Sequence, residues 1–218
     1  MQNMKAPDLK DKIILASQSP RRRYLLERAG LKFRVIPSDL DEGSIPAAPP
    51  DDYVRTLATA KARDVARSHP ESWVIGADTV VVVDDRLLGK PASTAEARTM
   101  LRRLSGRTHC VLTGICICRL VDNRFYADTV KTDVLFKELT NPEIDWYIQT
   151  GEPFDKAGAY AIQGIGTFLV KRIHGSYTNV VGLPVCEVIE FLLREKVIGF
   201  EEPHPETVCR PHADAEVM

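Results

Sequence analysis

Serine and arginine side chains cluster directly after a short apolar run near the start of the chain. The letters KIILAS, which end at Ser17, are typical of a buried strand. Ser19 suits a helix N-cap and Pro20 the first helical position, so a helix should begin there. Its free N–H groups and positive dipole, with the guanidinium groups of Arg21 and Arg22, would bind an anion such as phosphate. A serine cap followed by a solvated basic turn explains the same residues equally well.

A lysine shares the apolar stripe of the helix predicted over residues 51–68. Lys61 is seven residues after Val54, four after Leu57 and four before Val65, so it faces inward with them. A buried ammonium group is costly unless it is paired. The lysine either reaches along its apolar stem to solvent or faces a cleft that holds an anion.

Two carboxylates are candidates for a metal site or a general base. Asp78 interrupts the apolar strand pattern of residues 73–84, and Glu42 lies in the loop before the helix at 51–68. A strand-end aspartate that caps nearby N–H groups is the alternative for Asp78. Two carboxylates with waters and phosphate oxygens are a usual way to hold Mg²⁺ or Mn²⁺. Sequence alone does not bring these two residues together.

Two further polar residues lie in turn segments. Lys90 stands in the stiff turn Leu-Gly-Lys-Pro, where a surface lysine is the simpler interpretation. Gln163 lies in the glycine-rich run GEPFDKAGAYAIQG, whose glycines imply special backbone angles. Its amide can donate one hydrogen bond and accept another, although it can equally be a simple turn residue.

The elements that must position these residues alternate without strict β-α-β order, which predicts an α/β fold with a mixed sheet and flanking helices. The strand 108–119 is apolar on both faces and should be central in the sheet, and the strand 124–136 alternates. The other expected strands cover 12–17, 33–36, 73–84 and 168–173, and the expected helices cover 20–29, 51–68, 93–104, 141–151 and 184–196.

Composition excludes several classes of protein. The 218 residues are 44% hydrophobic and 27% charged, with a net charge of −1, so the chain is globular and is not a basic nucleic-acid binder as a whole. No apolar run is long enough to span a membrane, and residues 1–12 lack the apolar core of a secretory signal. The five cysteines form no metal or disulfide pattern, so we expect a cytoplasmic protein with reduced thiols.

The chain divides into one folded domain and two tails. Residues 1–11 are polar and aperiodic, which favours a flexible lead-in. Residues 199–218 carry five acids and one arginine with little to bury, which favours a flexible acidic tail. The domain should therefore cover residues 12–198.

Seven sequence words, taken together and in order, resemble the Maf family of nucleoside triphosphate pyrophosphatases. They are ILASQSPRR, ATAKA, GADTVV, GKP, LRRLSGRTHCVLTG, GEPFDKAGAYAIQG and GSYTNVVGLP, which lie between residues 14 and 184. The resemblance as a whole extends from about residue 13 to residue 195. The resemblance implies two lobes around a deep cleft, similar to the inosine-triphosphate pyrophosphatase fold. It also implies hydrolysis of a nucleoside triphosphate to the monophosphate and pyrophosphate with a divalent cation, Mg²⁺ or Mn²⁺, and it makes a homodimer plausible.

The resemblance also assigns roles residue by residue. Asp78 matches the catalytic carboxylate, and Glu42 and Asp78 would hold the metal. The positions linked to substrate choice are Arg21, Thr79 and Gln163, and the other matching cleft residues are Ser17, Arg22, Lys61 and Lys90.

The words KAGAYAIQG and GSY resemble the branch of the family that prefers dTTP and UTP. Uracil and thymine offer O4 and N3–H, a pair that one amide, that of Gln163, complements, whereas cytosine inverts it. Three alternatives remain open: the same chemistry on 7-methyl-GTP, a phosphatase that releases orthophosphate, and a non-catalytic nucleotide-binding regulator of septum formation. A nucleic-acid module is less well supported, because residues 1–36 carry a charge of +6 but few aromatic residues.

Overall fold

The computed structural model describes residues 12–199, so the lead-in expected at 1–11, the acidic tail beyond residue 199 and Cys209 lie outside the described residues. The described helices and strands, with η for 3₁₀ helices, are as follows: β1 Ile13–Leu15, α2 Pro20–Arg28, β2 Arg34–Val35, η1 Glu42–Ser44, α3 Pro50–Ser68, β3 Trp73–Val83, β4 Arg86–Leu88, α4 Thr94–Leu104, β5 Thr108–Arg119, β6 Arg124–Phe136, α5 Asn141–Gln149, η2 Glu152–Asp155, η3 Ala157–Ala159, η4 Gly164–Leu169, β7 Val170–His174, α6 Tyr177–Val181 and α7 Val185–Arg194.

A mixed sheet of seven strands forms the centre of the described part of the chain. Its order is β2-β1-β3-β5-β6-β7, and β4 pairs separately with β3. β1 is parallel to both β2 and β3, whereas β3, β5, β6 and β7 follow one another antiparallel. This arrangement confirms the predicted α/β class with a mixed sheet, and β5 is central, as its two apolar faces predicted.

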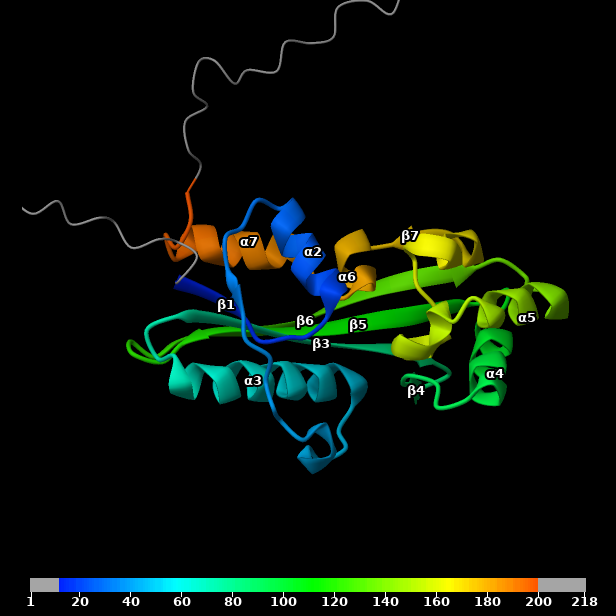
Figure 1. The fold of residues 1–218 in the computed structure, drawn as a ribbon, viewed down its shortest axis with the longest axis horizontal. Helices are drawn as coiled ribbons and strands as arrows, with labels where there is room; N and C mark the ends of the chain where they lie inside the picture. The colour runs from blue at the N-terminus through cyan, green and yellow to red at the C-terminus, as the bar shows by residue number, and fades with distance from the viewer. Residues whose placement is uncertain (1–11, 200–218) are drawn as a thin grey trace, which may run out of the picture.

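Helices cover both faces of this sheet (Figure 1). The long helix α3 lies along one face, and α2, α6 and α7 lie on the opposite face. The helices α4 and α5 pack against the end of the sheet that is distant from α7. Within residues 12–199, no helix is both long and apolar enough to cross a bilayer.

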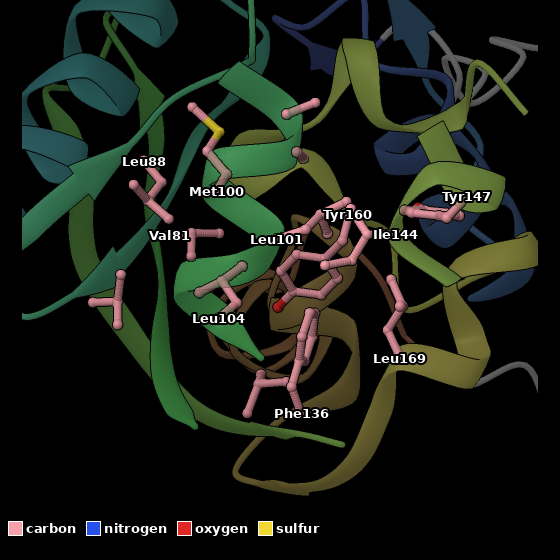
Figure 2. Packing of buried hydrophobic residues seen from close by; sticks show 14 of the residues in the cluster. Val81, Leu88, Met100, Leu101, Leu104, Phe136, Ile144, Tyr147, Tyr160 and Leu169 are labelled. Carbon is pink, nitrogen blue, oxygen red and sulfur yellow. The ribbon is translucent and has the colours of Figure 1, made fainter. Parts of the chain in front are cut away.

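Separate apolar clusters form at the two ends of the sheet. One end buries the side chains of β1, α2 and α7 around Trp73 and Phe191. The other end buries α4, α5 and the 3₁₀ segments around Phe136 and Tyr160, whose ring centroids are 4.6 Å apart (Figure 2). The molecule therefore has two lobes, as expected, but the same long strands run through both.

Two glycines let α3 lie unusually close to the sheet. A Cβ atom on Gly76 of β3 would lie 2.3 Å from the carbonyl oxygen of Ala58, and one on Gly114 of β5 would lie 2.2 Å from that of Val54. Neither contact is possible for a larger residue unless the backbone moves. Glycine at these two strand positions therefore sets the distance between α3 and the strands that it covers.

Most predicted elements are present, with small errors. The predicted strands 108–119 and 124–136 match β5 and β6 to the residue. Ala29, the last residue of the predicted helix 20–29, is exposed and lies outside the helix, because α2 ends at Arg28 and the chain turns away at Gly30 with a φ of +78°. The short elements β4, α6 and η1 to η4 were not predicted.

Candidate active site

A gap along one edge of β3 forms the candidate site. β1 pairs with this edge at Trp73–Ile75, and β4 pairs with it at Val81–Val83. Residues 76–80 between them have no strand partner on this side. A cleft of about 1000 Å³ opens at the gap and is lined by both lobes. Its size suits a nucleotide-sized ligand, and it lies just beyond the carboxyl end of β1, where ligands of α/β sheets commonly bind.

Asp78, Lys61 and Glu42 meet in this cleft. The Lys61 Nζ atom lies 2.7 Å from Asp78 Oδ1 and 2.7 Å from Glu42 Oε1. The side chains of Lys61 and Asp78 are only 13% and 12% exposed, whereas that of Glu42 is 59% exposed. The structure thus brings together two carboxylates that the sequence could not place, and the lysine lies between them.

The position of α3 over the sheet explains how Lys61 reaches Asp78. Asp78 lies on the same face of β3 as Gly76 and opposite Gly114 of β5, so α3 passes directly over this patch. Lys61 extends from the buried stripe of α3 and ends at the carboxylates. Of the two alternatives for this lysine, the structure shows the cleft-facing one. Asp78 lies in the middle of a regularly paired strand and not at a bulge.

The charges around Glu42 keep its side chain ionised. Partial burial opposes ionisation of this carboxyl group, and the hydrogen bond and charge of Lys61 act against that effect. The charges of Lys90 and Arg22 act in the same direction, and together they lower the pKa of Glu42. A carboxylate with a lowered pKa stays available as an oxygen ligand at neutral pH.

Arg22 connects the segments that line one side of the cleft. Its guanidinium group donates to the carbonyl oxygens of Gly182 at 2.7 Å and Ala77 at 2.8 Å, and to the hydroxyl groups of Ser17 and Thr79, both at 3.1 Å. Burial lowers its pKa, and the nearby charge of Asp78 partly offsets this effect. Because these bonds occupy most of its donors, direct contact between Arg22 and phosphate stays a prediction.

Thr79 belongs to a buried polar network that sequence reasoning missed. Its hydroxyl lies 2.9 Å from that of Thr113, which donates to the carbonyl oxygen of Asn179. The Asn179 amide in turn donates to the carbonyl oxygen of Val111 and to Thr132 Oγ1. This network fixes α6 against β5 and β6 on the opposite side of β3 from Lys61. The SYTN letters inside an otherwise apolar region were the available signal.

Arg21 reaches across the mouth of the cleft. Its Nη1 atom donates to Asp155 Oδ2 at 2.8 Å, which joins the first turn of α2 to η2 of the other lobe. The hydrogen bonds from Arg21 and from Lys156 lower the pKa of Asp155 against the opposing effect of partial burial. Both Asp155 and Lys156 line the cleft, although sequence reasoning noted them only as part of a glycine-rich run.

Lys90 and Gln163 complete the cleft lining from two further loops. Neither side chain has a hydrogen-bond partner among residues 12–199. Gln163 precedes η4 in extended conformation. Both side chains are therefore available to a ligand in the cleft, the lysine as a cation and the glutamine as a donor and acceptor.

The lining of the cleft has a net positive charge, and two of its carboxylates, those of Glu42 and Asp78, lie close together. Five cationic and three anionic side chains line it, a net charge of +2, with Arg21, Arg22, Lys61, Lys90 and Lys156 against Glu42, Asp78 and Asp155. Among residues 12–199, no group of three or more His, Cys, Asp or Glu side chains could hold a metal without help. The pair Glu42 and Asp78 still fits Mg²⁺ or Mn²⁺, because such ions usually take one or two carboxylates and complete their shell with water and phosphate.

An α/β fold with an anion-attracting cleft and two adjacent carboxylates has the features expected of an enzyme that acts on phosphorylated ligands such as nucleotides. The sequence profile of the family described as Maf-like protein matches residues 12–195. The chain belongs to the Maf-like protein family, which confirms the resemblance in the sequence.

Curated relatives carry one recurring name. The chain is 50% identical over 184 residues to a dTTP/UTP pyrophosphatase of Syntrophus aciditrophicus (strain SB), a match that covers 84% of this chain and 90% of the relative. It is 52% identical over 185 residues to a protein of the same name from Syntrophotalea carbinolica, with 84% of each chain covered. A third, from Halalkalibacterium halodurans, is 50% identical over 188 residues, which cover 86% of this chain and 96% of the relative.

Proposed function

We propose that this protein hydrolyses dTTP and UTP to the nucleoside monophosphate and pyrophosphate. The observation that carries the proposal is the convergence of Asp78, Lys61 and Glu42 at the gap in β3, inside a positive cleft of nucleotide size. The names of relatives about half identical over nearly the whole domain support the substrate class.

The triphosphate would lie between the start of α2 and the side chains of Lys61 and Lys90. A nucleoside triphosphate carries about four negative charges at neutral pH, and the cleft has an excess of cations to attract it. Ser17, the N-terminus of α2 and Lys90 supply donors for phosphate oxygens. Lys61 is already paired, so its role is to hold the two carboxylates and to add positive charge close to them.

Asp78 would accept the proton of the attacking water. The water oxygen forms a bond to the α-phosphorus, the bond from that phosphorus to the α-β bridging oxygen breaks, and pyrophosphate leaves in line. The carboxylate of Asp78 is held in one orientation by Lys61, which suits a general base. Glu42 and Asp78 would also hold Mg²⁺ or Mn²⁺, which when bound supplies Lewis-acid stabilisation of phosphate charge.

Gln163 would recognise the base. Its amide can donate to O4 and accept from N3–H of uracil or thymine. In that same amide orientation, cytosine would leave both groups facing like partners. Arg21 and Thr79 are the other two residues that we assign to substrate choice. Arg21 acts at the cleft mouth beside Asp155, and Thr79 acts through the network that places Arg22.

The remaining parts of the proposal concern the setting of the activity. The four cysteines in residues 12–199 are free thiols, which suits a reducing cytoplasm. We propose that the enzyme controls nucleotide pools, including modified pyrimidine nucleotides, as a homodimer without a nucleic-acid partner.

Product analysis tests the proposed function directly. Purified protein is incubated with each ordinary and deoxynucleoside triphosphate and with 7-methyl-GTP, in Mg²⁺ or Mn²⁺, and nucleotides and phosphates are separated. We expect monophosphate and pyrophosphate from dTTP and UTP and little product from the others.

Three other outcomes point to the alternatives. Turnover of 7-methyl-GTP in place of dTTP and UTP would retain the chemistry and overturn the base assignment. Release of orthophosphate would indicate a phosphatase. Tight binding of dTTP or UTP with no turnover would favour the non-catalytic regulator.

A further inference from the structure

A single carboxylate holds both ends of the loop that carries Gln163. Glu152 Oε1 accepts from the backbone N–H of Gly166 at 2.8 Å, and Oε2 accepts from that of Ile165 at 3.0 Å. These donors lie two and three residues after Gln163 in the chain. Glu152 itself does not line the cleft, since only its neighbours Asp155 and Lys156 do so.

The other end of the loop is held through a buried tyrosine. Tyr147 of α5 is 0% exposed, and its hydroxyl donates to Glu152 Oε1 at 2.8 Å. The same hydroxyl accepts from the backbone N–H of Ala161 at 3.2 Å. Burial and the hydrogen bond to Glu152 raise the pKa of Tyr147, so the hydroxyl keeps its proton and donates. Figure 2 shows this side chain within the apolar cluster of the lobe.

Two glycines allow the loop to approach the carboxylate. A Cβ atom on Gly164 would lie 2.6 Å from Glu152 Oε2, and one on Gly166 would lie 2.4 Å from the carbonyl oxygen of Ala161 and 2.6 Å from the Tyr147 hydroxyl. Gly164 also has a φ of +71°. The loop backbone is therefore built around Glu152, and Gln163 lies in the chain between the anchored Ala161 and the anchored pair Ile165 and Gly166.

We infer that Glu152, together with Tyr147, is a positioning residue for base selection, because it fixes the backbone on both sides of Gln163. This inference rests on the proposed function, since it assumes that Gln163 contacts the base. A side chain that must present a donor and an acceptor to one base edge needs its backbone held to a fraction of an ångström. Three hydrogen bonds to one carboxylate, and a fourth through the tyrosine, provide that restraint.

The test compares nucleotide selectivity in Glu152→Gln and Tyr147→Phe. Glutamine has nearly the same shape but turns one acceptor into a donor that faces an N–H group, and phenylalanine removes the link to Ala161. We expect kcat/KM for dTTP relative to dCTP to fall roughly tenfold in each variant, the effect of losing about one well-placed hydrogen bond. The loss should come mainly from a higher KM for dTTP.

Matched controls carry the same chemical changes elsewhere. Tyr126→Phe removes another tyrosine hydroxyl that donates to a carboxylate, that of Asp128, and Glu138→Gln changes an exposed glutamate outside the cleft. Both should keep the wild-type ratio. Gln163→Ala should lower the ratio by itself, and adding Glu152→Gln to it should lower the ratio no further, because Glu152 acts through Gln163.

A merely structural role would give a different result. It would lower kcat/KM for dTTP and dCTP by equal factors and leave their ratio unchanged, and that outcome overturns the inference. Independent losses in the double variant overturn it as well. Hydrogen exchange of the peptide that covers residues 161–166 should become faster in Glu152→Gln, and unchanged exchange would contradict the proposed restraint.

Failure of the proposed function is separable from failure of this inference. If wild-type protein releases no pyrophosphate, the proposed function fails, and calorimetric affinities for the α,β-methylene analogues of dTTP and dCTP still test the effect of Glu152→Gln on selectivity. If turnover is normal but Gln163→Ala leaves the ratio unchanged, the pyrophosphatase activity stands and the role of Glu152 in base selection is refuted.

Discussion

Lys61 balances the charge of two neighbouring carboxylates in the cleft. Its ammonium group contacts Asp78 and Glu42 at equal distances, so it holds two carboxylates that would otherwise repel each other. Pairing also explains how a lysine can lie on the buried stripe of α3. At the scale of single residues, the cleft is therefore a compensated charge cluster whose balance a single substitution would disturb.

Asp78→Asn should remove most turnover and leave the fold intact. The amide cannot accept the proton of the attacking water, and we expect kcat to fall by roughly a hundredfold or more, the usual share of a general base. Lys61 keeps its contact with Glu42, so circular dichroism and nucleotide binding should stay close to wild type. Asp128→Asn, on an exposed part of β6, is the control. Near-normal kcat in Asp78→Asn would refute the assignment of the base.

Lys61→Met should raise the pKa of Glu42. In the wild-type protein burial raises this pKa, and the hydrogen bond and charge of Lys61 are the largest of the contributions that lower it. Without the lysine, only the weaker effects of Lys90 and Arg22 would oppose burial, and the carboxyl group would protonate at higher pH. The Glu42 side-chain carbon signal, followed by NMR during a pH titration, measures the change. Lys90→Met should give a smaller rise, and equal rises would show that the contact with Lys61 has no special weight.

At the scale of elements, the site depends on how closely α3 lies to β3 and β5. Gly76 and Gly114 allow this approach, and Lys61 reaches Asp78 only because α3 passes directly over them. A shift of α3 relative to β3 and β5 would therefore also move Lys61 relative to Asp78.

Gly114→Ala should destabilise the protein and reduce activity together. The added Cβ would lie 2.2 Å from the carbonyl oxygen of Val54, so α3 must move or lose contact with the sheet. We expect a loss of about 1–3 kcal/mol in the free energy of unfolding, measured with urea, and a lower kcat in the folded fraction. Gly199→Ala meets no atom within 4 Å and is the control. Full stability in Gly114→Ala would show that α3 shifts without cost.

Elements with strong local signals were predictable from the sequence. The apolar run at 108–119 and the alternating pattern at 124–136 predicted the strands β5 and β6 to the residue. Short elements such as β4 and α6 gave too few residues for a period to be detected. The stripe on α3 predicted that Lys61 faces inward, but its contact with Asp78 and Glu42 depends on long-range packing. The anchoring role of Glu152 depends on a loop whose shape no periodicity encodes.

At the scale of the whole molecule, stability includes a buried histidine. His109 of β5 is 3% exposed, and its Nε2 atom lies 2.7 Å from the hydroxyl of Tyr160, which lines the cleft. Its Nδ1 atom is buried without a hydrogen-bond partner among the described residues. Burial lowers the pKa of His109 to about 4, so the folded protein keeps this ring neutral.

Acid should therefore weaken the fold before carboxylates protonate. Between the ordinary histidine pKa of 6.5 and about 4, the unfolded chain binds a proton at this ring and the folded chain does not. Above pH 6.5 His109 is neutral in both states and costs no stability. As the pH falls from 6.5 to about 4, the free energy of unfolding decreases by about 3 kcal/mol in total because of this ring. The free energy of unfolding, measured with urea at several pH values, should depend less steeply on pH in His109→Gln than in wild type. His174→Gln, at an exposed site, should keep the wild-type slope, and equal slopes in all three proteins would refute the role of His109.

The continuity of the long strands limits how the molecule can respond to a ligand. β3 contributes Ile75 to one apolar cluster and Val81 to the other, and β5 likewise contributes Ile115 and Val111. A rigid-body rotation that closed the cleft would have to bend these hydrogen-bonded strands together, at a cost in ladder bonds and packing. Adjustment to the ligand therefore falls to the rim loop around residues 37–49, since the loop that carries Gln163 is anchored by Glu152 and Tyr147. The radius of gyration from small-angle X-ray scattering should consequently be the same with and without nucleotide, and a compaction on binding would show that the sheet bends.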